Sequence, residues 1–549
     1  MQLPAEMRET GSTSQEDFGL PLERSTGQRI VVGILSSLVL GLSGMWPLKA
    51  AEQLEVQLDG MVIPITIEDL TEWGNLSGED HSELGIWLRL LDRKSREALQ
   101  KLLQAPLLSN RSMARQMLRS WAGLKLLDEI SDLVLIDGDS RGTIFLNTLE
   151  RLLNEQSHIT TMDLLESLPA KRIRIDLDGL LLDANRWYQH IQSQRQLVQV
   201  LHGVPFRVET MPSGEEVEAL SPLRLQLIKL PVAHRPEPLH LQLWKAPPSA
   251  PSRPSWVALM PGLGGSPDHF RWLAAGLSLD GWPVVVLEHP GSDAKALQDL
   301  LEGLRPPPGA EVLPDRLADL NAVITARDQG VLPIRRERLV LIGHSLGSLT
   351  AVLAAGATPV DGLEQRCSRA LDGLPLTNLS RLLQCQLADV SLPMVDPPQD
   401  LEAIVALNSF GSLLWPLSDA AAVKVPMLLA GGTLDLITPP ASEQLALLLA
   451  LSSHPTSRVL LFEGGSHFSP IQVPTDPAEG AAQDLFRLGD DLVGIQPQAV
   501  RRLMMIEIST FLEQVEAKEA LESSAHLEVD GLRLHRLNRA GVAQLNLSK

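Results

Sequence analysis

The chain has 549 residues, more than one hydrophobic core usually organises, so two domains with extensions are expected. Hydrophobic residues make up 44% and charged residues 21%, which is typical of a globular protein and excludes wholesale disorder. The formal net charge of −20 at pH 7 excludes nucleic acid as an expected partner, because a negative surface repels a phosphate backbone.

An uncharged, mostly apolar segment lies near the N-terminus, at residues 30–48 between Arg29 and Lys49. Its length fits an export signal or a membrane anchor, and a buried core helix is the alternative. Three glycines and the lack of a polar face favour export or anchoring. We therefore predict a leader over residues 1–29 and a signal peptide or membrane anchor over residues 30–51. The protein is then exported, to a periplasm or thylakoid lumen, or held at a membrane through residues 30–48, and cleavage of the signal stays open.

Residues 52–190 are predicted to form a mainly helical N-terminal domain. It opens with a hairpin pattern, since two alternating apolar runs flank Asp59-Gly60, a pair that suits the positive φ angles of a tight turn. Helical spacing follows in residues 67–73, 82–91, 95–103, 112–121, 142–155 and 162–168. No catalytic cluster is visible in this domain, and its partner is not predicted. We expect a linker over residues 191–222.

From residue 223 the pattern becomes strand, loop and helix, repeated, which predicts a mostly parallel sheet covered by helices on both faces. The eight predicted strands are residues 225–230, 239–244, 256–260, 283–287, 339–342, 403–407, 426–430 and 459–462. This arrangement predicts an α/β-hydrolase fold over residues 223–517. A long interruption at residues 358–400, between the fifth and sixth strands, is predicted to be a lid. Nothing in the tail, residues 518–549, indicates chemistry.

The strongest motif is Gly343-His344-Ser345-Leu346-Gly347, between an apolar strand and a helix-compatible run. The glycines at both ends of the motif allow a sharp reversal that exposes the hydroxyl of Ser345 above the sheet. Ser345 is therefore the predicted nucleophile. The alternative is an ordinary turn between a strand and a helix.

A serine hydroxyl needs a base, and the base needs an acid that orients it. His467 follows the last predicted strand, where a loop can lean over the serine, and Asp435 follows the strand before it. The order serine, acid, histidine and the spacing favour Asp435 over Asp419 and Glu463, the competing acids.

Catalysis of this kind also needs backbone donors for the developing oxyanion. One predicted donor is the N–H of Leu346, next to the nucleophile. The other is the N–H of Leu263 in the glycine-rich loop at residues 261–265, which follows the third predicted strand.

The chain has two cysteines, Cys367 and Cys385, with neither a C-x-x-C pattern nor a Cys/His group at metal-ligand spacing. We therefore expect no metal site. No cofactor is expected either, because the proposed serine, histidine and aspartate require none. In an exported protein the two thiols are expected to form a disulfide within the lid, and two buried free thiols are the alternative.

Together these residues resemble a group of predicted serine hydrolases, widespread in cyanobacteria, that join an uncharacterised helical N-terminal domain to an α/β-hydrolase. The resemblance covers residues 51 to about 514. The catalytic half is similar to the platelet-activating-factor acetylhydrolase and polyester-hydrolase group through five features: residues 261–263, residues 289–292, the motif around Ser345, Asp435 and His467. Relatives often carry the label dienelactone hydrolase, an enzyme with a cysteine where this chain has Ser345.

The sequence thus predicts a serine hydrolase that cleaves a small-molecule or lipid ester through an acyl-enzyme. A thioesterase, a lipase or an acyltransferase would use the same three residues. The alternative from another class is a non-catalytic, membrane-associated scaffold or binding protein on a hydrolase fold.

Overall fold

The computed structural model describes residues 51–545, except 76–82, 90–91, 105, 109–110, 138, 140–141, 157–158, 211–223, 374–376, 417–422, 473–493, 521–522 and 530. The predicted leader and the predicted signal or anchor lie outside the described residues, apart from Ala51. In the described part of the chain, no helix combines the length and the apolar character that a membrane span requires.

The N-terminal domain packs helices against a four-stranded sheet with the order β2-β1-β6-β4. The predicted hairpin is confirmed: β1 and β2 pair antiparallel, and Asp59 and Gly60 turn between them with φ of 50° and 73°. Beyond the expectation of a mainly helical domain, β6 adds a parallel strand beside β1, and β4 pairs with β6. The strands are β1 Gln53–Leu58, β2 Met61–Thr66, β4 Val134–Ile136 and β6 Arg172–Asp176, with a separate pair β3 Pro106–Leu108 and β5 Ile159–Thr160. The helices are α2 Ile67–Asn75, α3 Glu83–Leu88, α4 Arg93–Gln104, α5 Arg111–Leu118, α6 Trp121–Leu133, α7 Thr143–Glu155 and α8 Thr161–Ser167.

The second domain is built on a sheet that has 11 strands among the described residues, in the order β7-β16-β17-β15-β14-β13-β12-β10-β11-β9-β8. All eight predicted strands are present and adjacent, and the six from β10 to β15 run parallel. They are β8 Arg224–Leu230, β9 Leu239–Lys245, β10 Ser255–Met260, β11 Val284–Leu287, β12 Arg338–His344, β13 Leu401–Leu407, β14 Met427–Gly432 and β15 Arg458–Phe462.

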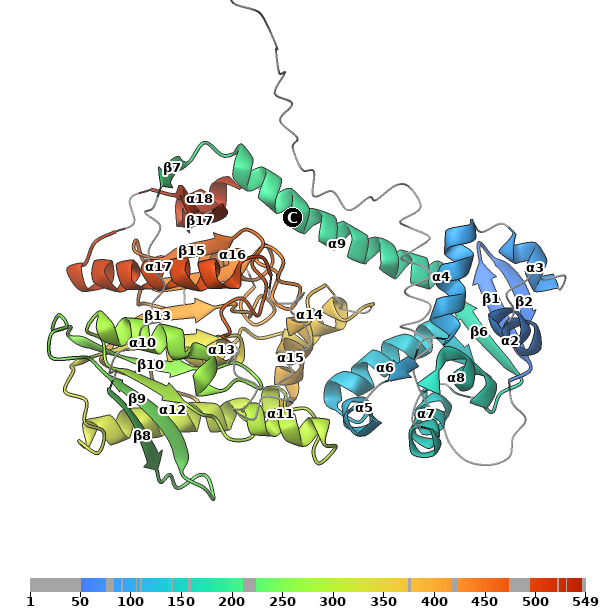
Figure 1. Ribbon diagram of the computed structural model, residues 1–549, viewed down its shortest axis with the longest axis horizontal. Coiled ribbons are helices and arrows are strands. Elements are labelled where there is room, and N and C mark those ends of the chain that lie inside the picture. The colour runs from blue at the N-terminus through green and yellow to red at the C-terminus, as the bar shows by residue number, and fades with distance from the viewer. Residues whose placement is uncertain are drawn as a thin grey trace, which may run out of the picture.

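Helices cover both faces of this sheet, as predicted (Figure 1). Side chains along β10 alternate between two hydrophobic cores, one on each face of the sheet. Trp256, Ala258 and Met260 pack in one core with α12 and α13. Val257 and Leu259 pack in the other with α10 and α17. A strand buried on both faces therefore reads as a continuous apolar run. The helices are α10 Arg271–Leu279, α11 Ala294–Leu301, α12 Leu313–Asp328, α13 Leu346–Ala354, α16 Gln444–Leu451 and α17 Pro497–Ala517.

The structure differs from the predicted linker and tail. Helix α9, Leu177–Gly203, runs through the first part of the predicted linker, and its Leu197 and Leu201 are buried in the hydrolase core. Strand β7, Arg207–Thr210, pairs with β16, Ala525–Val529, and β17, Leu532–Asn538, pairs with β15. A final helix, α18, spans Arg539–Gln544. Both segments thus extend the hydrolase sheet and core, because their apolar residues alternate and find neighbours that are distant in sequence.

The predicted lid contains α14, Leu363–Ala370, and α15, Ser380–Gln386. A disulfide joins Cys367 of α14 to Cys385 of α15, with a Cα–Cα distance of 5.4 Å, so the structure has the bridge and not two free thiols. Both lid helices lie between the hydrolase sheet and α6 of the N-terminal domain (Figure 1).

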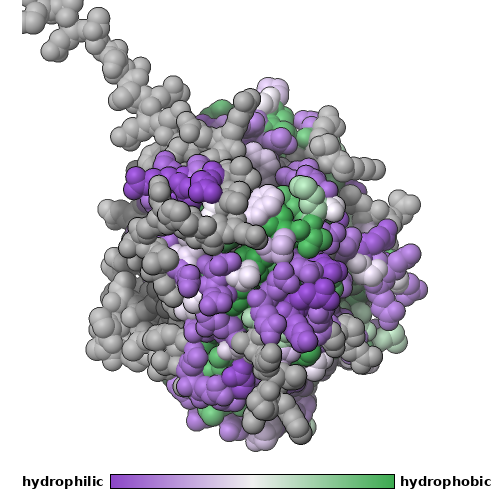
Figure 2. All heavy atoms as spheres, turned by 90° about the vertical axis from the view of Figure 1, so that its right-hand side faces the viewer, coloured by the Kyte–Doolittle hydropathy of each residue, from purple (hydrophilic) through white to green (hydrophobic). Residues whose placement is uncertain are grey.

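The N-terminal domain contacts the lid through side chains. The indole N–H of Trp121 donates to Asp389 at 2.7 Å, and the backbone N–H of Gly373 donates to Glu129 at 2.9 Å. The side of the molecule that carries this domain is mostly hydrophilic, with small apolar areas between the polar side chains (Figure 2).

Candidate active site

Ser345 sits at the turn from β12 into α13, as the motif predicts. Its backbone has φ 51° and ψ −117°, a conformation that is costly for a residue with a side chain and marks a turn held by its surroundings. The N–H of Ser345 donates to the carbonyl of Leu407 on the neighbouring strand at 2.9 Å. This hydrogen bond therefore fixes the turn to the end of the neighbouring strand β13.

Both glycines of the motif are required by close backbone contacts. A Cβ on Gly347 would lie 2.0 Å from the carbonyl oxygen of Met260, and one on Gly343 would lie 2.2 Å from the carbonyl carbon of Gly347. A side chain at either position would push the turn away from β10 or from its own helix.

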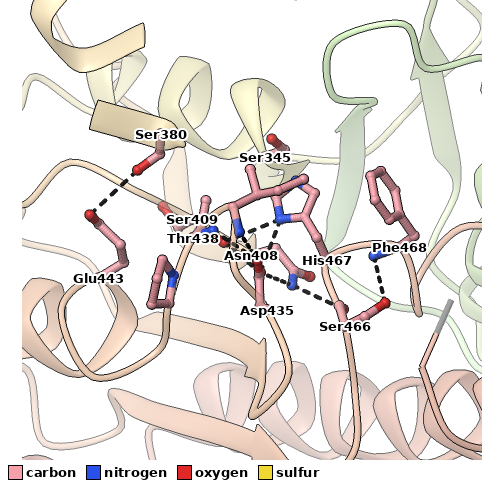
Figure 3. A network of polar contacts seen from close by, with 12 residues as sticks. Ser345, Ser380, Asn408, Ser409, Asp435, Thr438, Glu443, Ser466, His467 and Phe468 are labelled. Carbon is pink, nitrogen blue, oxygen red and sulfur yellow. Dashed lines mark hydrogen bonds and ion pairs between the residues drawn. The ribbon is translucent and has the colours of Figure 1, made fainter. Parts of the chain in front are cut away.

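His467 and Asp435 come from loops that follow β15 and β14, and Ser345 follows β12. Because β12, β13, β14 and β15 are parallel neighbours, their carboxyl ends meet at one edge of the sheet. There His467 Nδ1 lies 3.0 Å from Asp435 Oδ2 (Figure 3). Asp435 is fully buried and His467 is 5% exposed, so the ion pair is shielded from solvent.

Asp435 is surrounded by hydrogen-bond donors. Its Oδ1 accepts from the backbone N–H groups of Ile437 and Thr438, both at 2.8 Å. Its Oδ2 accepts from the Thr438 hydroxyl at 2.6 Å and from Asn408 Nδ2 at 2.8 Å, besides His467. Burial alone would raise the pKa of Asp435, but His467 and the Thr438 donors lower it below its ordinary value. The carboxylate is therefore ionised and can only accept.

His344 forms a hydrogen bond to the loop that carries His467. Its Nε2–H donates to the backbone carbonyl of His467 at 3.0 Å, and the two rings lie 5.0 Å apart between centroids. Burial, with a contribution from His467, lowers the pKa of His344 to about 3, so its ring is neutral at ordinary pH. The residue next to the predicted nucleophile thus has a positioning contact.

The glycine-rich loop lies against the serine. A Cβ on Gly262 would lie 3.1 Å from the Cβ of Ser345, so this loop, with Leu263 next in sequence, approaches the nucleophile closely. Leu346 is the first residue of α13, and its N–H has no partner inside the helix. The two backbone groups predicted to bind an oxyanion therefore belong to segments on either side of the serine.

Arg316, which the sequence analysis missed, holds this loop in place. It is buried, and its guanidinium donates to the carbonyl of Pro261 and to the Ser292 hydroxyl. The carbonyl of Ser292 in turn accepts from the N–H of Gly264 at 2.8 Å. Burial lowers the pKa of Arg316 to about 9, which leaves it cationic at neutral pH.

Asn408 and Thr438 were also missed. Asn408 directly follows β13 with φ 48°, and Thr438 lies three residues after Asp435. A signal for Asn408 exists in the sequence, because a polar residue at the carboxyl end of a central parallel strand reaches the edge where ligands bind.

A second buried carboxylate, Glu443, fixes the lid to the core. It accepts from Ser380 at the start of the lid helix α15 (Figure 3). It also accepts from Asn378, just before this helix, and from Gly411 and Ser412 after β13. The lid is therefore anchored within a few residues of the strand that precedes Asn408.

Two family models match the chain. Residues 50–176 match a family described as alpha/beta hydrolase of unknown function, and residues 257–483 match the alpha/beta hydrolase family. No curated protein matches the chain. Together with the mostly parallel sheet, the helices on both of its faces and the serine at the turn after β12, these matches show that the chain has the α/β-hydrolase fold.

Proposed function

We propose that this chain is a serine hydrolase that cleaves carboxylic esters through an acyl-enzyme. One observation carries the proposal: Ser345, held at φ 51°, shares an edge of the sheet with a buried His467–Asp435 pair whose Nδ1 and Oδ2 are 3.0 Å apart. A buried, oriented imidazole is what a serine hydroxyl needs to become a nucleophile at neutral pH.

In the proposed reaction the Ser345 oxygen attacks the ester carbonyl while His467 Nε2 takes the hydroxyl proton. The N–H groups of Leu263 and Leu346 bind the oxyanion, and Asp435 stabilises the imidazolium. His467 then gives its proton to the departing alcohol, which leaves an acyl group on Ser345. A water molecule, deprotonated by His467, releases the carboxylic acid and restores the serine.

Exposed leucines beside the site support an ester with an apolar acyl group. Leu434 and Leu436 flank Asp435 and are 54% and 44% exposed. The N–H of Leu379, at the start of the lid helix, donates to the carbonyl of Leu436 at 3.5 Å, so lid and acid loop meet here. An apolar chain lying on these leucines would cover them, which favours a lipid or other apolar ester.

The proposal includes an exported or membrane-held location. The disulfide between Cys367 and Cys385 supports it, because such bridges persist in oxidising compartments. Fractionation of cells into cytoplasm, membrane and exported fractions tests it, and a purely cytoplasmic protein would contradict it.

Labelling with a fluorophosphonate probe, followed by an ester panel graded by acyl length, tests the function. We expect the folded protein to label at Ser345, a Ser345→Ala variant not to label, and turnover to rise from acetate to longer acyl esters. Monodisperse protein that does not label would favour the non-catalytic scaffold. Thioester turnover well above that of matched oxyesters would favour a thioesterase.

A further inference from the structure

Outside the active site, three potential metal ligands converge from distant parts of the chain. His202 lies near the end of α9, Glu463 directly follows β15, and His535 lies on β17. Glu463 Oε1 is 2.5 Å from His202 Nε2 and 2.7 Å from His535 Nε2. The ligand atoms of all three residues lie within 4.8 Å of one another.

The hydrogen bonds of His535 fix the tautomer of its ring. His526 Nε2 must donate to the carbonyl of Val204, 3.1 Å away, so in a neutral ring its Nδ1 can only accept. The donor in the 2.7 Å contact between the two Nδ1 atoms is therefore His535. A neutral His535 ring with its proton on Nδ1 faces Glu463 with the lone pair of Nε2.

His202 also directs a lone pair at the same point. Arg533 Nη1 lies 2.8 Å from His202 Nε2, and a guanidinium can only donate, so Nε2 accepts. Glu463 Oε1 is close to both nitrogens and is the third potential ligand atom of the group. Lone pairs of two imidazole nitrogens and one carboxylate oxygen thus point together, and a cation among them would convert this repulsion into ligation.

We propose that His202 Nε2, Glu463 Oε1 and His535 Nε2 bind one divalent transition-metal ion, with Zn²⁺ the best match. Two imidazoles and one carboxylate are a zinc donor set, whereas Ca²⁺ and Mg²⁺ prefer oxygen ligands alone. Zinc ligands lie about 2.1 Å from the ion, so tetrahedral ligand atoms are roughly 3.3 Å apart. The two short contacts must therefore widen by less than about 1 Å, which the side chain of His202, 41% exposed, can accommodate.

The surroundings leave room for a fourth ligand from solvent. A surface cavity of about 540 Å³ adjoins the site and is lined by Glu463, Gly464, Glu528 and Arg533 among others. Arg533 also pairs with Glu528, which can retain the guanidinium when the ion takes the lone pair of His202.

Such an ion would join three segments that the sequence keeps apart. His202 belongs to the helix from the N-terminal domain, His535 to the C-terminal hairpin, and Glu463 to the loop that carries His467 four residues later. We infer a structural site that secures the sheet extension and steadies the loop of the histidine. Sequence reasoning expected no metal site, because the ligands are 261 and 72 residues from Glu463.

Metal content of the full-length, tag-free protein tests the site independently of any hydrolase activity. After loading with Zn²⁺ and extensive buffer exchange, we expect about one equivalent to remain, and titration calorimetry to give a single tight site. His202→Gln and Glu463→Gln should each lower the Zn²⁺ affinity at least about 100-fold. Arg533→Gln should bind at least as tightly as the unchanged protein, because its charge opposes the ion.

The control is His240→Gln, since the exposed His240 pairs with Glu288 on the opposite part of the sheet, and the Zn²⁺ affinity of this variant should not change. Circular dichroism checks that each variant is folded, and the exposed His202 is a position where a glutamine is readily tolerated. Failure of the unchanged protein to retain Zn²⁺ would overturn the proposal. Equal affinity in the His202 and Glu463 variants would overturn it too.

Discussion

Replacing Asp435 with asparagine should disable the site through the histidine tautomer and not through loss of the fold. Oδ1 of Asp435 accepts from two backbone N–H groups, which cannot reverse, so the amide oxygen must take that place. The amide nitrogen then occupies the position of Oδ2, opposite His467 Nδ1. The histidine can meet this donor only by carrying its proton on Nε2, where it can no longer accept one from Ser345.

We expect the wrong tautomer to lower kcat about 10³- to 10⁴-fold, because the base is absent while the oxyanion donors remain. Each tenfold loss corresponds to about 1.4 kcal/mol, so the barrier rises by about 4 to 6 kcal/mol. Stability should fall less than activity, since Asn408 and the Thr438 hydroxyl can reverse their roles toward an amide.

The assay is steady-state turnover of an apolar ester, with urea unfolding of the same samples. Asp396→Asn is the matched control, because Asp396 is exposed and lies before β13, and it should keep normal turnover. The reasoning fails if Asp435→Asn stays within tenfold of the unchanged protein, or if Glu463→Gln abolishes turnover while Asp435→Asn does not.

Three further predictions concern the turn at Ser345 and the lid. Gly347→Ala should lose both activity and several kcal/mol of unfolding free energy, because its Cβ would lie 2.0 Å from a backbone oxygen; thermal unfolding with probe labelling measures this. The pKa of His344 falls from 6.5 to about 3 on folding, so stability is full above about pH 6.5 and decreases below it as the unfolded state takes up a proton. Between about pH 6.5 and 4.5, His344 should cause a loss of about 2 kcal/mol of unfolding free energy, and the His344→Gln variant should lack this loss. Urea unfolding with the same pH dependence in both proteins would contradict this. Reducing the Cys367–Cys385 bridge, which spans 18 residues, should cost about 3 kcal/mol and change turnover of bulky esters more than of acetates, and alkylation of unreduced, denatured protein followed by intact mass should find no adduct.

The parallel strands β10 to β15 could be predicted because each contains a short apolar run, which burial on both faces makes continuous. Strands β8 and β9 could be predicted from alternating apolar residues. Ser345, Asp435 and His467 could then be predicted to lie together, since the fold fixes where the carboxyl ends of the strands meet. Arg316 could not be found in this way, because it lies inside α12 and reaches Pro261 across 55 residues. The sheet extension was missed for a similar reason. Strands β16 and β17 pair with each other, and they are also held by pairing with β7 and β15, which are distant from them in sequence.

The lid connects the N-terminal domain to the site. On one side Trp121 and Glu129 bond to Asp389 and Gly373, and on the other Glu443 bonds to the start of α15. These contacts reach the lid, whereas Asp435 and His467 are held by bonds within the hydrolase domain. A change at Trp121 therefore acts first on the position of the lid, and it reaches the His467–Asp435 pair through the contact between the lid and Leu436. Substitutions in the N-terminal domain should then alter which esters enter the site before they alter proton transfer, which the ratio of kcat/KM for bulky and small esters measures.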